Sequence, residues 1–454
     1  MQSLFKATIN WYVFLIFAIA IFLLFPNLSW FSYIALIISF HQFLLLFYSI
    51  DHFIPIRYLS GTLMCLQMFI GPVLAYNGVD DYQYFNYKMK IPESEYFTYV
   101  IPAVICFIIG LHFTAGKLKG EFIKISDIQA FTNNHEELPF WFIGIGFVSS
   151  IVAAYFSSDL AFVFYLLGNF KYIGAFLLII SKKQLNALTL FIVFGSIILS
   201  SLGSGMFHDL LTWIMMGGAV LAIKYKPGIK IRIFSFFLFL LIAIVIQQVK
   251  GTYRSSILGG QEAGIETFQK VVQESNDDNT LFSSKSMAIS TVRINQGFII
   301  TNIMVTVPAK VPFAYGSELQ SLLEAAILPR ILAPDKLKAG DRTLFTKYSG
   351  LNLRQGTSMG LSSVGDAYIN FGIVGGCVFM FFLGLLFNLV LKAFFKFERN
   401  YPILILFTAL VFYYPIRPDC ELQTILGHLV KACFLIFIIF FFWKKQFRVQ
   451  PAES

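Results

Sequence analysis

The chain has 454 residues, of which 57% are hydrophobic, 17% aromatic and only 13% charged, and its mean hydropathy is +0.72. A soluble globule cannot bury that much apolar surface, so the composition excludes a soluble protein and predicts an all-α polytopic membrane protein. The formal charge of +9 gathers in short loops and not on one soluble face with interleaved aromatic residues, which argues against a nucleic-acid partner.

About twelve apolar runs are long enough to cross roughly 30 Å of hydrocarbon as helices. In chain order they cover residues 8–25, 28–50, 58–76, 97–116, 139–156, 160–180, 185–202, 209–223, 233–250, 366–391, 401–416 and 422–443. Lysine and arginine gather at 117–124, 182–183, 224–232, 392–399 and 444–448, all on one side of a twelve-helix arrangement. Basic short loops stay in the cytoplasm, so both termini are predicted to be cytoplasmic.

One long connection, about 115 residues between the ninth and tenth spans, breaks the pattern of short loops. The sequence therefore divides into spans 1–9 in residues 1–250, an extracytoplasmic loop or cap in 251–365, spans 10–12 in 366–443 and a tail in 444–454. Within the loop, 261–280 and 316–334 have the apolar spacing of helices, and 290–313 suits an interfacial or re-entrant element. Loops of this length usually carry function, so candidate residues are sought here first.

Five basic residues near this loop are candidate anion ligands. Lys250 and Arg254 stand four residues apart and either project toward an anion or anchor at the membrane interface. Arg293 lies in an apolar stretch, where an unpaired guanidinium is costly. Arg354 is surrounded by turn residues and is either a ligand or simply solvated, and Arg417 lies in the short outer turn "YYPIRPDCE" between two prolines.

Two histidines on the same side are further candidates. His428 and Lys431 fall in the outer half of the last span, where they either face a cavity or make a structural hydrogen bond. For His208 and Asp209, in "GSGMFHD", a helix cap is the favoured interpretation. The cysteines and histidines show no metal-ligand or disulfide spacing, so no metal or other cofactor is expected.

The stretch "SSVGDAYINFGIVGG" places polar residues at the mouth of a membrane helix. In a helix Asp366 and Asn370 share a face that points into the bundle. Gly372 and Gly376 form a GxxxG pair that permits close approach of a neighbouring helix. Asp366 either caps the N-terminus of its own helix or takes part in chemistry, and both roles can hold.

The long outer loop, "KGTYR" at its entrance, an arginine in an apolar segment and "SSVGDAYINFGIVGG" at its exit resemble the O-antigen and capsule repeat-unit polymerases of the Wzy family. The family's Gly-(Asp/Glu)-x-Tyr-x-Asn-Phe-Gly-x-x-Gly pattern is matched by Gly365, Asp366, Tyr368, Asn370, Phe371, Gly372 and Gly375. The N-terminal half carries no signature of that family.

The resemblance implies a metal-independent, inverting glycosyl transfer between undecaprenyl-pyrophosphate-linked oligosaccharides at the outer face of a bacterial inner membrane. A chain-length regulator and a flippase would act in the same pathway. Guanidinium groups would stabilise the departing pyrophosphate, and a carboxylate or histidine would take the proton of the sugar hydroxyl. The expected pyrophosphate ligands are Arg254, Arg293, Arg354 and Arg417, with Lys250 secondary; the expected base is Asp366, with His428 as its rival.

Two other classes stay open. An O-antigen ligase would use the same lipid donor with a different acceptor, and the matched motif favours a polymerase over it. A twelve-helix transporter or lipid flippase is the non-enzymatic alternative. Against a transporter, the long loop follows the ninth span and no internal repeat is visible, whereas two six-helix halves predict a central break.

Overall fold

The structure, a computed structural model, describes residues 9–78, 87–114, 124–156, 158–181, 186–277, 281–327, 340, 342–353, 359–398 and 400–448. Every regular element in these residues is a helix. Among them, eight runs are long and apolar enough to cross a membrane. The chain is therefore a helical protein with the composition of a membrane protein, and the expected count of twelve spans is not confirmed.

The eight runs include several helices that are interrupted or joined end to end. They are α2 (Trp30–Ser49), the series α3 (Ile56–Cys65), η1 (Leu66–Ile70) and α4 (Gly71–Tyr76), α5 (Glu93–His112), the pair α8 (Ser158–Gly168) and α9 (Phe170–Ile180), α10 (Ala187–Ser204), α12 (Ile229–Leu258), α18 (Ser362–Glu398) and α20 (Leu422–Phe442). Four apolar runs are shorter, namely α1 (Trp11–Leu24), α7 (Leu138–Val152), α15 (Gly297–Thr306) and η5 (Pro402–Phe407) followed by α19 (Thr408–Val411).

Three expected spans depart from the prediction for visible reasons. The run at 209–223 forms α11 (His208–Tyr225), whose polar residues His208, Asp209 and Lys224 lower its mean hydropathy. The run at 401–416 starts at Pro402 as a 3-10 helix and leaves its helical conformation after Val411, well short of a bilayer's thickness. In the opposite direction, α12 continues to Leu258, eight residues beyond its expected end at 250.

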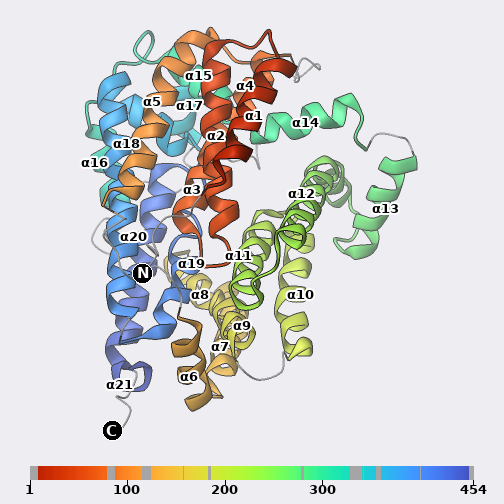
Figure 1. The fold of residues 1–454 in the computed structure, drawn as a ribbon, viewed down its shortest axis with the longest axis vertical. Coiled ribbons are helices and arrows are strands. Elements are labelled where there is room, and N and C mark those ends of the chain that lie inside the picture. The colour runs from red at the N-terminus through yellow and green to blue at the C-terminus, as the bar shows by residue number, and fades with distance from the viewer. Residues whose placement is uncertain are drawn as a thin grey trace.

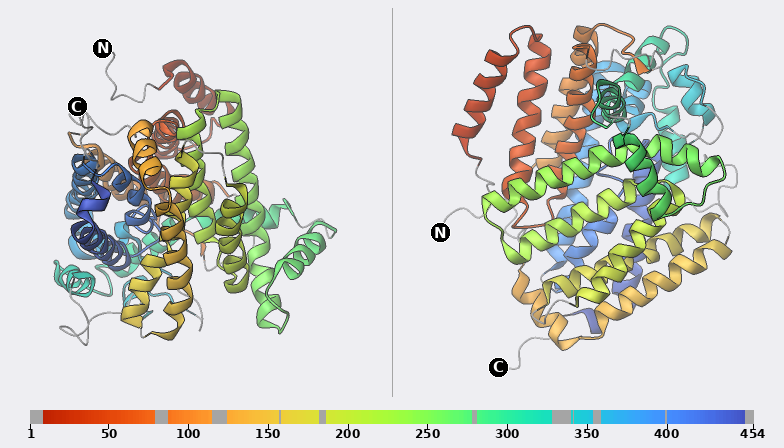
Figure 2. Two further views of the ribbon diagram at one scale, coloured as in Figure 1. Left: turned by 90° about the horizontal axis from the view of Figure 1, so that it is seen from below. Right: turned by 90° about the vertical axis from the view of Figure 1, so that its right-hand side faces the viewer.

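The helices fall into two groups that run in different directions. α2, α3, α5 and α18 stand upright in Figure 1, and α5 lies along the side of α18. The right-hand view of Figure 2 shows α7 to α12, coloured yellow to green, running obliquely to the red and orange helices. The C-terminal end of α12 is thereby brought near elements that follow it much later in the chain.

The connection between α12 and α18 is largely helical. It contains α13 (Ile265–Asp277), α14 (Ser284–Ile294), α15, α16 (Ser317–Ile327) and α17 (Arg342–Ser349). Both α13 and α14 contact α12, while α15 and α17 lie together over the start of α18 (Figure 1). The apolar stretch expected at 290–313 is split between α14 and α15, because the backbone of Asn295 is extended.

Three further short helices complete the described chain. α6 (Ile125–Asn134) packs against α9 and η5, and η4 (Ala153–Tyr155) links α7 to α8. α21 (Lys444–Phe447) follows α20 and ends near the C-terminus (Figure 1).

Candidate functional site

Four basic side chains from three separate segments gather at the C-terminal end of α12. Lys250 and Arg254 lie on one face of α12, Arg293 lies in the last turn of α14, and Arg417 lies in the turn between α19 and α20. The charges of Arg293, Arg254 and Arg417 all act on Lys250, together with the opposite charge of Asp419. We call Lys250, Arg254, Arg293 and Arg417 the basic cluster.

Arg254 rests on a glycine of the turn between α10 and α11. A Cβ atom on Gly205 would lie 2.9 Å from Cγ and 3.7 Å from Nε of Arg254. Gly205 ends α10 with a φ of +62°, in the left-handed region that favours glycine. The turn thus leaves room for the stem of Arg254, whose side chain is exposed.

The side chain of Arg293 is exposed and not buried in the bundle. Its Nη2 atom would lie 3.9 Å from a Cβ on Gly251, which places the guanidinium over α12 between the positions of Lys250 and Arg254. The apolar residues that made the stretch look buried are those of α15, which enter the core after the break at Asn295.

Arg417 is held by an acidic and an aromatic neighbour. Its Nη2 atom donates to Oδ2 of Asp419 at 2.8 Å, and its guanidinium lies 5.4 Å from the ring centre of Tyr414. Burial alone would raise the pKa of Asp419, but the charge of Arg417 and the hydrogen bond from it lower that pKa overall. The carboxylate therefore stays charged and fixes the guanidinium in place.

A histidine and an aspartate adjoin the basic cluster. Nε2 of His208 lies 2.6 Å from Oδ1 of Asp209, and the Tyr413 hydroxyl donates to the same oxygen. The charge of Arg417 acts on Asp209, and a protonated His208 would act on Asp419. The expected helix cap is not formed, because Phe207 is the N-cap residue of α11 and makes no side-chain cap bond.

Asp366 caps a helix other than its own. Its buried carboxylate accepts a hydrogen bond from the N–H of Leu422, the first residue of α20, at 2.8 Å. Asn370 does the same for α16, since its Oδ1 accepts from the N–H of Leu319 at 3.1 Å. Its Nδ2 also donates to the carbonyl of Asp366 at 2.9 Å. The expectation that Asp366 caps its own helix is thus wrong, because the partner is the unsatisfied N-terminus of α20.

The remaining motif residues pack α18 against its neighbours. The Tyr368 ring lies 5.1 Å from that of Tyr99 on α5 and 5.7 Å from that of Phe313. Gly376 faces Tyr99, whose Cε2 and hydroxyl would lie 3.0 Å from a Cβ there. Gly372 does not pair with Gly376 against that helix; it has a φ of +64° and forms a kink in α18 beside Phe313.

His428 is enclosed in the bundle. Its Nε2 lies 2.7 Å from the carbonyl oxygen of Leu410, and Nδ1 has no hydrogen-bond partner among the described residues. Its ring lies 5.0 Å from the ring of Tyr414, with only 2% of the residue exposed. The structure therefore does not bring His428 to an open site. Arg354 lies outside the described residues.

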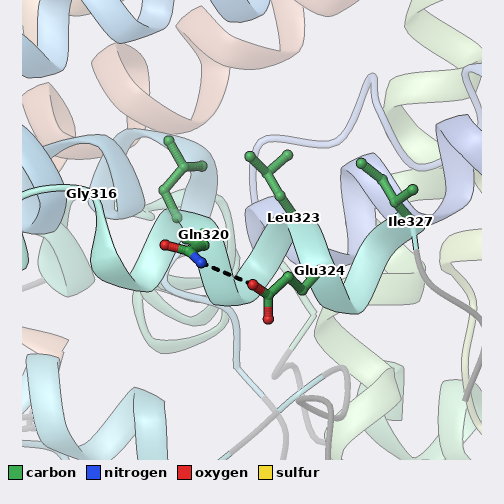
Figure 3. Close-up of a pocket in the computed structure, with 6 residues that line it drawn as sticks. Gly316, Gln320, Leu323, Glu324 and Ile327 are labelled. Atoms are coloured by element: carbon green, nitrogen blue, oxygen red, sulfur yellow. Dashed lines mark hydrogen bonds between the residues drawn. The ribbon is translucent and has the colours of Figure 1, made fainter. Parts of the chain in front are cut away.

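A shallow pocket on the surface of α16 is a separate feature. It is lined by Gly316, Leu319, Gln320, Leu323, Glu324 and Ile327, and Gln320 donates to Glu324 at 3.0 Å (Figure 3). None of these six lining residues is basic, so the pocket offers no cation to a phosphate. In the described part of the chain no group of three or more His, Cys, Asp or Glu side chains could hold a metal ion.

A comparison with known protein families finds a match over most of the chain. A family model described as a domain of unknown function (DUF8712) matches residues 74–445, which contain the basic cluster, His208, Asp209 and the whole of α18. No curated protein matches the chain, and no solved structure matches it.

Proposed function

We propose that this chain, which belongs to the DUF8712 family of unknown function, is a membrane glycosyltransferase that polymerises undecaprenyl-pyrophosphate-linked oligosaccharide repeat units of a surface polysaccharide. The observation that supports the proposal best is the basic cluster, which draws Lys250, Arg254, Arg293 and Arg417 from three segments. Like charges repel, so an anion bound among these four cations would lower the free energy of bringing them together. A pyrophosphate is such an anion.

The surface of α12 favours a lipid-linked anion over a soluble one. Almost none of the apolar stretch of α12 is buried inside the protein, and Phe234, Phe237 and Leu241 are exposed. Lys250 and Arg254 follow this apolar surface toward the end of the same helix. A molecule with a long hydrocarbon tail and a pyrophosphate head matches that order, tail along α12 and head at the basic cluster.

The chemistry needs charge stabilisation where the leaving group departs. In an inverting transfer the acceptor hydroxyl attacks the anomeric carbon, and undecaprenyl pyrophosphate leaves with the bonding electrons. Arginine forks match phosphate oxygens in a bidentate geometry and stabilise the charge that develops on them. Arg417 is already oriented by Asp419 and Tyr414, so its position costs little reorganisation when the charge forms.

Deletion of the gene in its native host tests the proposal. The surface polysaccharide is resolved on a gel, and the lipid-linked precursors are extracted in parallel. We expect the ladder to collapse to a single attached repeat unit. An intact ladder with unchanged precursors would overturn the proposal and indicate a transporter of another molecule. Loss of all attached sugar, with lipid-linked polymer accumulating, would overturn it in favour of a ligase.

Two single variants test the basic cluster itself. Removing one preorganised donor typically lowers kcat by about a hundredfold or more, so Arg254→Ala and Arg293→Ala should each shorten the ladder at matched protein levels. Lys270→Ala is the control, because Lys270 is an exposed cation of α13 whose pair with Glu274 spans 3.8 Å outside the basic cluster. Wild-type ladders from both arginine variants would remove the basic cluster from the mechanism.

A further inference from the structure

The pair formed by His208 and Asp209 has the features of a base held by a carboxylate. The side chain of His208 is 34% exposed, and its Nε2 lies 2.6 Å from Oδ1 of Asp209. That oxygen also accepts the hydroxyl hydrogen of Tyr413, so the carboxylate is fixed from two sides. With the Nε2 proton directed at Asp209, the Nδ1 atom of His208 is the nitrogen that can accept a proton.

Two independent observations place the pair of His208 and Asp209 beside the basic cluster. Gly205, against which Arg254 rests, precedes His208 by three residues, so their Cα atoms lie no more than about 11 Å apart. On the other side, one short segment holds both groups: Tyr413 binds Asp209, while Tyr414 and Asp419 bind Arg417. The pair and the anion ligands therefore border one site.

We propose that His208 is the general base that accepts the proton of the acceptor sugar hydroxyl, and that Asp209 and Tyr413 are positioning residues for it. The proposal rests on the glycosyl transfer proposed above. In this step the acceptor oxygen forms its bond to the anomeric carbon while the bond from that carbon to pyrophosphate breaks. The electron pair leaves with undecaprenyl pyrophosphate at the basic cluster, and the hydroxyl proton passes to Nδ1 of His208. Asp209 then stabilises the imidazolium.

The two bases expected from the sequence are less suited to this role. The carboxylate of Asp366 is buried and accepts the N–H of Leu422, and His428 is enclosed by Tyr414 and Phe162. A base must reach a sugar hydroxyl within hydrogen-bond distance. His208 is half-buried and the most accessible of the three, and it is the one that adjoins the basic cluster.

The test uses the full chain reconstituted in vesicles, with lipid-linked repeat units extracted from the deletion strain as substrate. General base catalysis contributes about 10²–10⁴-fold, so His208→Ala should lower kcat by that factor. The melting temperature and its rise on addition of undecaprenyl pyrophosphate should stay as in the wild type, whereas Arg254→Ala should lose that rise. Added imidazole should restore part of the activity of His208→Ala, which a structural role would not allow.

His52→Ala is the matched control, because His52 also lies beside an aspartate, with Nδ1 2.7 Å from Oδ1 of Asp51. Asp51 also pairs with Arg232 in the first turn of α12, at the opposite end of that helix from Lys250 and Arg254. It should retain wild-type kcat. If the deletion strain loses its ladder but His208→Ala keeps wild-type kcat, this inference fails and the proposed function stands. Loss of activity with no imidazole rescue and a lowered melting temperature also overturns it. An intact ladder in the deletion strain overturns both.

Discussion

At the scale of single residues, Gly205 supports the basic cluster without carrying a charge. Gly205→Ala would place a Cβ 2.9 Å from Cγ of Arg254 and would strain a backbone at a φ of +62°, at about 1–2 kcal/mol. We expect Arg254 to move and the Kd for undecaprenyl pyrophosphate to rise about tenfold. Gly203→Ala is the control, since no atom lies within 4 Å of its Cβ position. Equal Kd values for the two variants would contradict the role of this turn.

Asp366 offers a second test at this scale. An asparagine oxygen can still accept the N–H of Leu422, so Asp366→Asn should keep the melting temperature and the transferase activity of the wild type. Asp366→Ala removes the cap of α20 and should cost about 1–2 kcal/mol. Thermal unfolding in detergent and kcat are the two measurements. A folded but inactive Asp366→Asn protein would assign the proton transfer to Asp366 and not to His208.

The sequence predicted the charged side chains of the site but not the residues that hold those side chains in position. Lys250, Arg254, Arg293 and Arg417 are visible because a cation beside apolar sequence is costly and therefore suggests a role. Gly205 and Tyr413 give no such signal, because glycine and tyrosine carry no comparable cost there. Their roles arise from contacts between segments far apart in the sequence, which neither spacing nor periodicity encodes.

At the scale of elements, the kink in α18 depends on one glycine. Gly372 has a φ of +64° and a ψ of −157°, a region that residues with a Cβ rarely occupy, and a Cβ there would lie 3.4 Å from the Phe313 ring. Gly372→Ala should therefore destabilise the protein by about 1–3 kcal/mol. Gly144→Ala is the control, because no atom lies within 4 Å of its Cβ position in α7. An unchanged melting temperature for Gly372→Ala would mean that α18 tolerates a straight path.

Composition predicted where helices form better than where they stop. The helical runs expected at 261–280 and 316–334 correspond to α13 and α16. α12, however, passes the expected boundary at 250 although Gly251 is a weak helix former, because tertiary contacts from α13 and α14 support this end. Hydropathy marks the edge of the apolar region, and the helix continues beyond it with Lys250 and Arg254 on one face.

At the scale of the whole molecule, the oblique course of α7 to α12 is what assembles the site. The right-hand view of Figure 2 shows these helices crossing toward the side where α13 lies. An upright α12 would end beside its sequence neighbours, whereas the oblique one ends where Arg293 of α14 and Arg417 can reach Lys250. Pairing of distant segments through tilt is a property of side-chain packing, and a hydropathy profile does not contain it.

The proposed chemistry at the outer face predicts the direction of the chain across the membrane. It requires the connection between α12 and α18 to lie outside the cell membrane. Tyr315→Cys and Tyr225→Cys introduce thiols at positions that are 82% and 53% exposed. In intact cells a membrane-impermeant maleimide should label Tyr315→Cys, and it should label Tyr225→Cys only after lysis, since Tyr225 lies among the basic residues 224–232. The parent protein gives the background from its five native cysteines. The reverse pattern would place the basic cluster on the cytoplasmic side, where a donor delivered to the outer leaflet could not reach it.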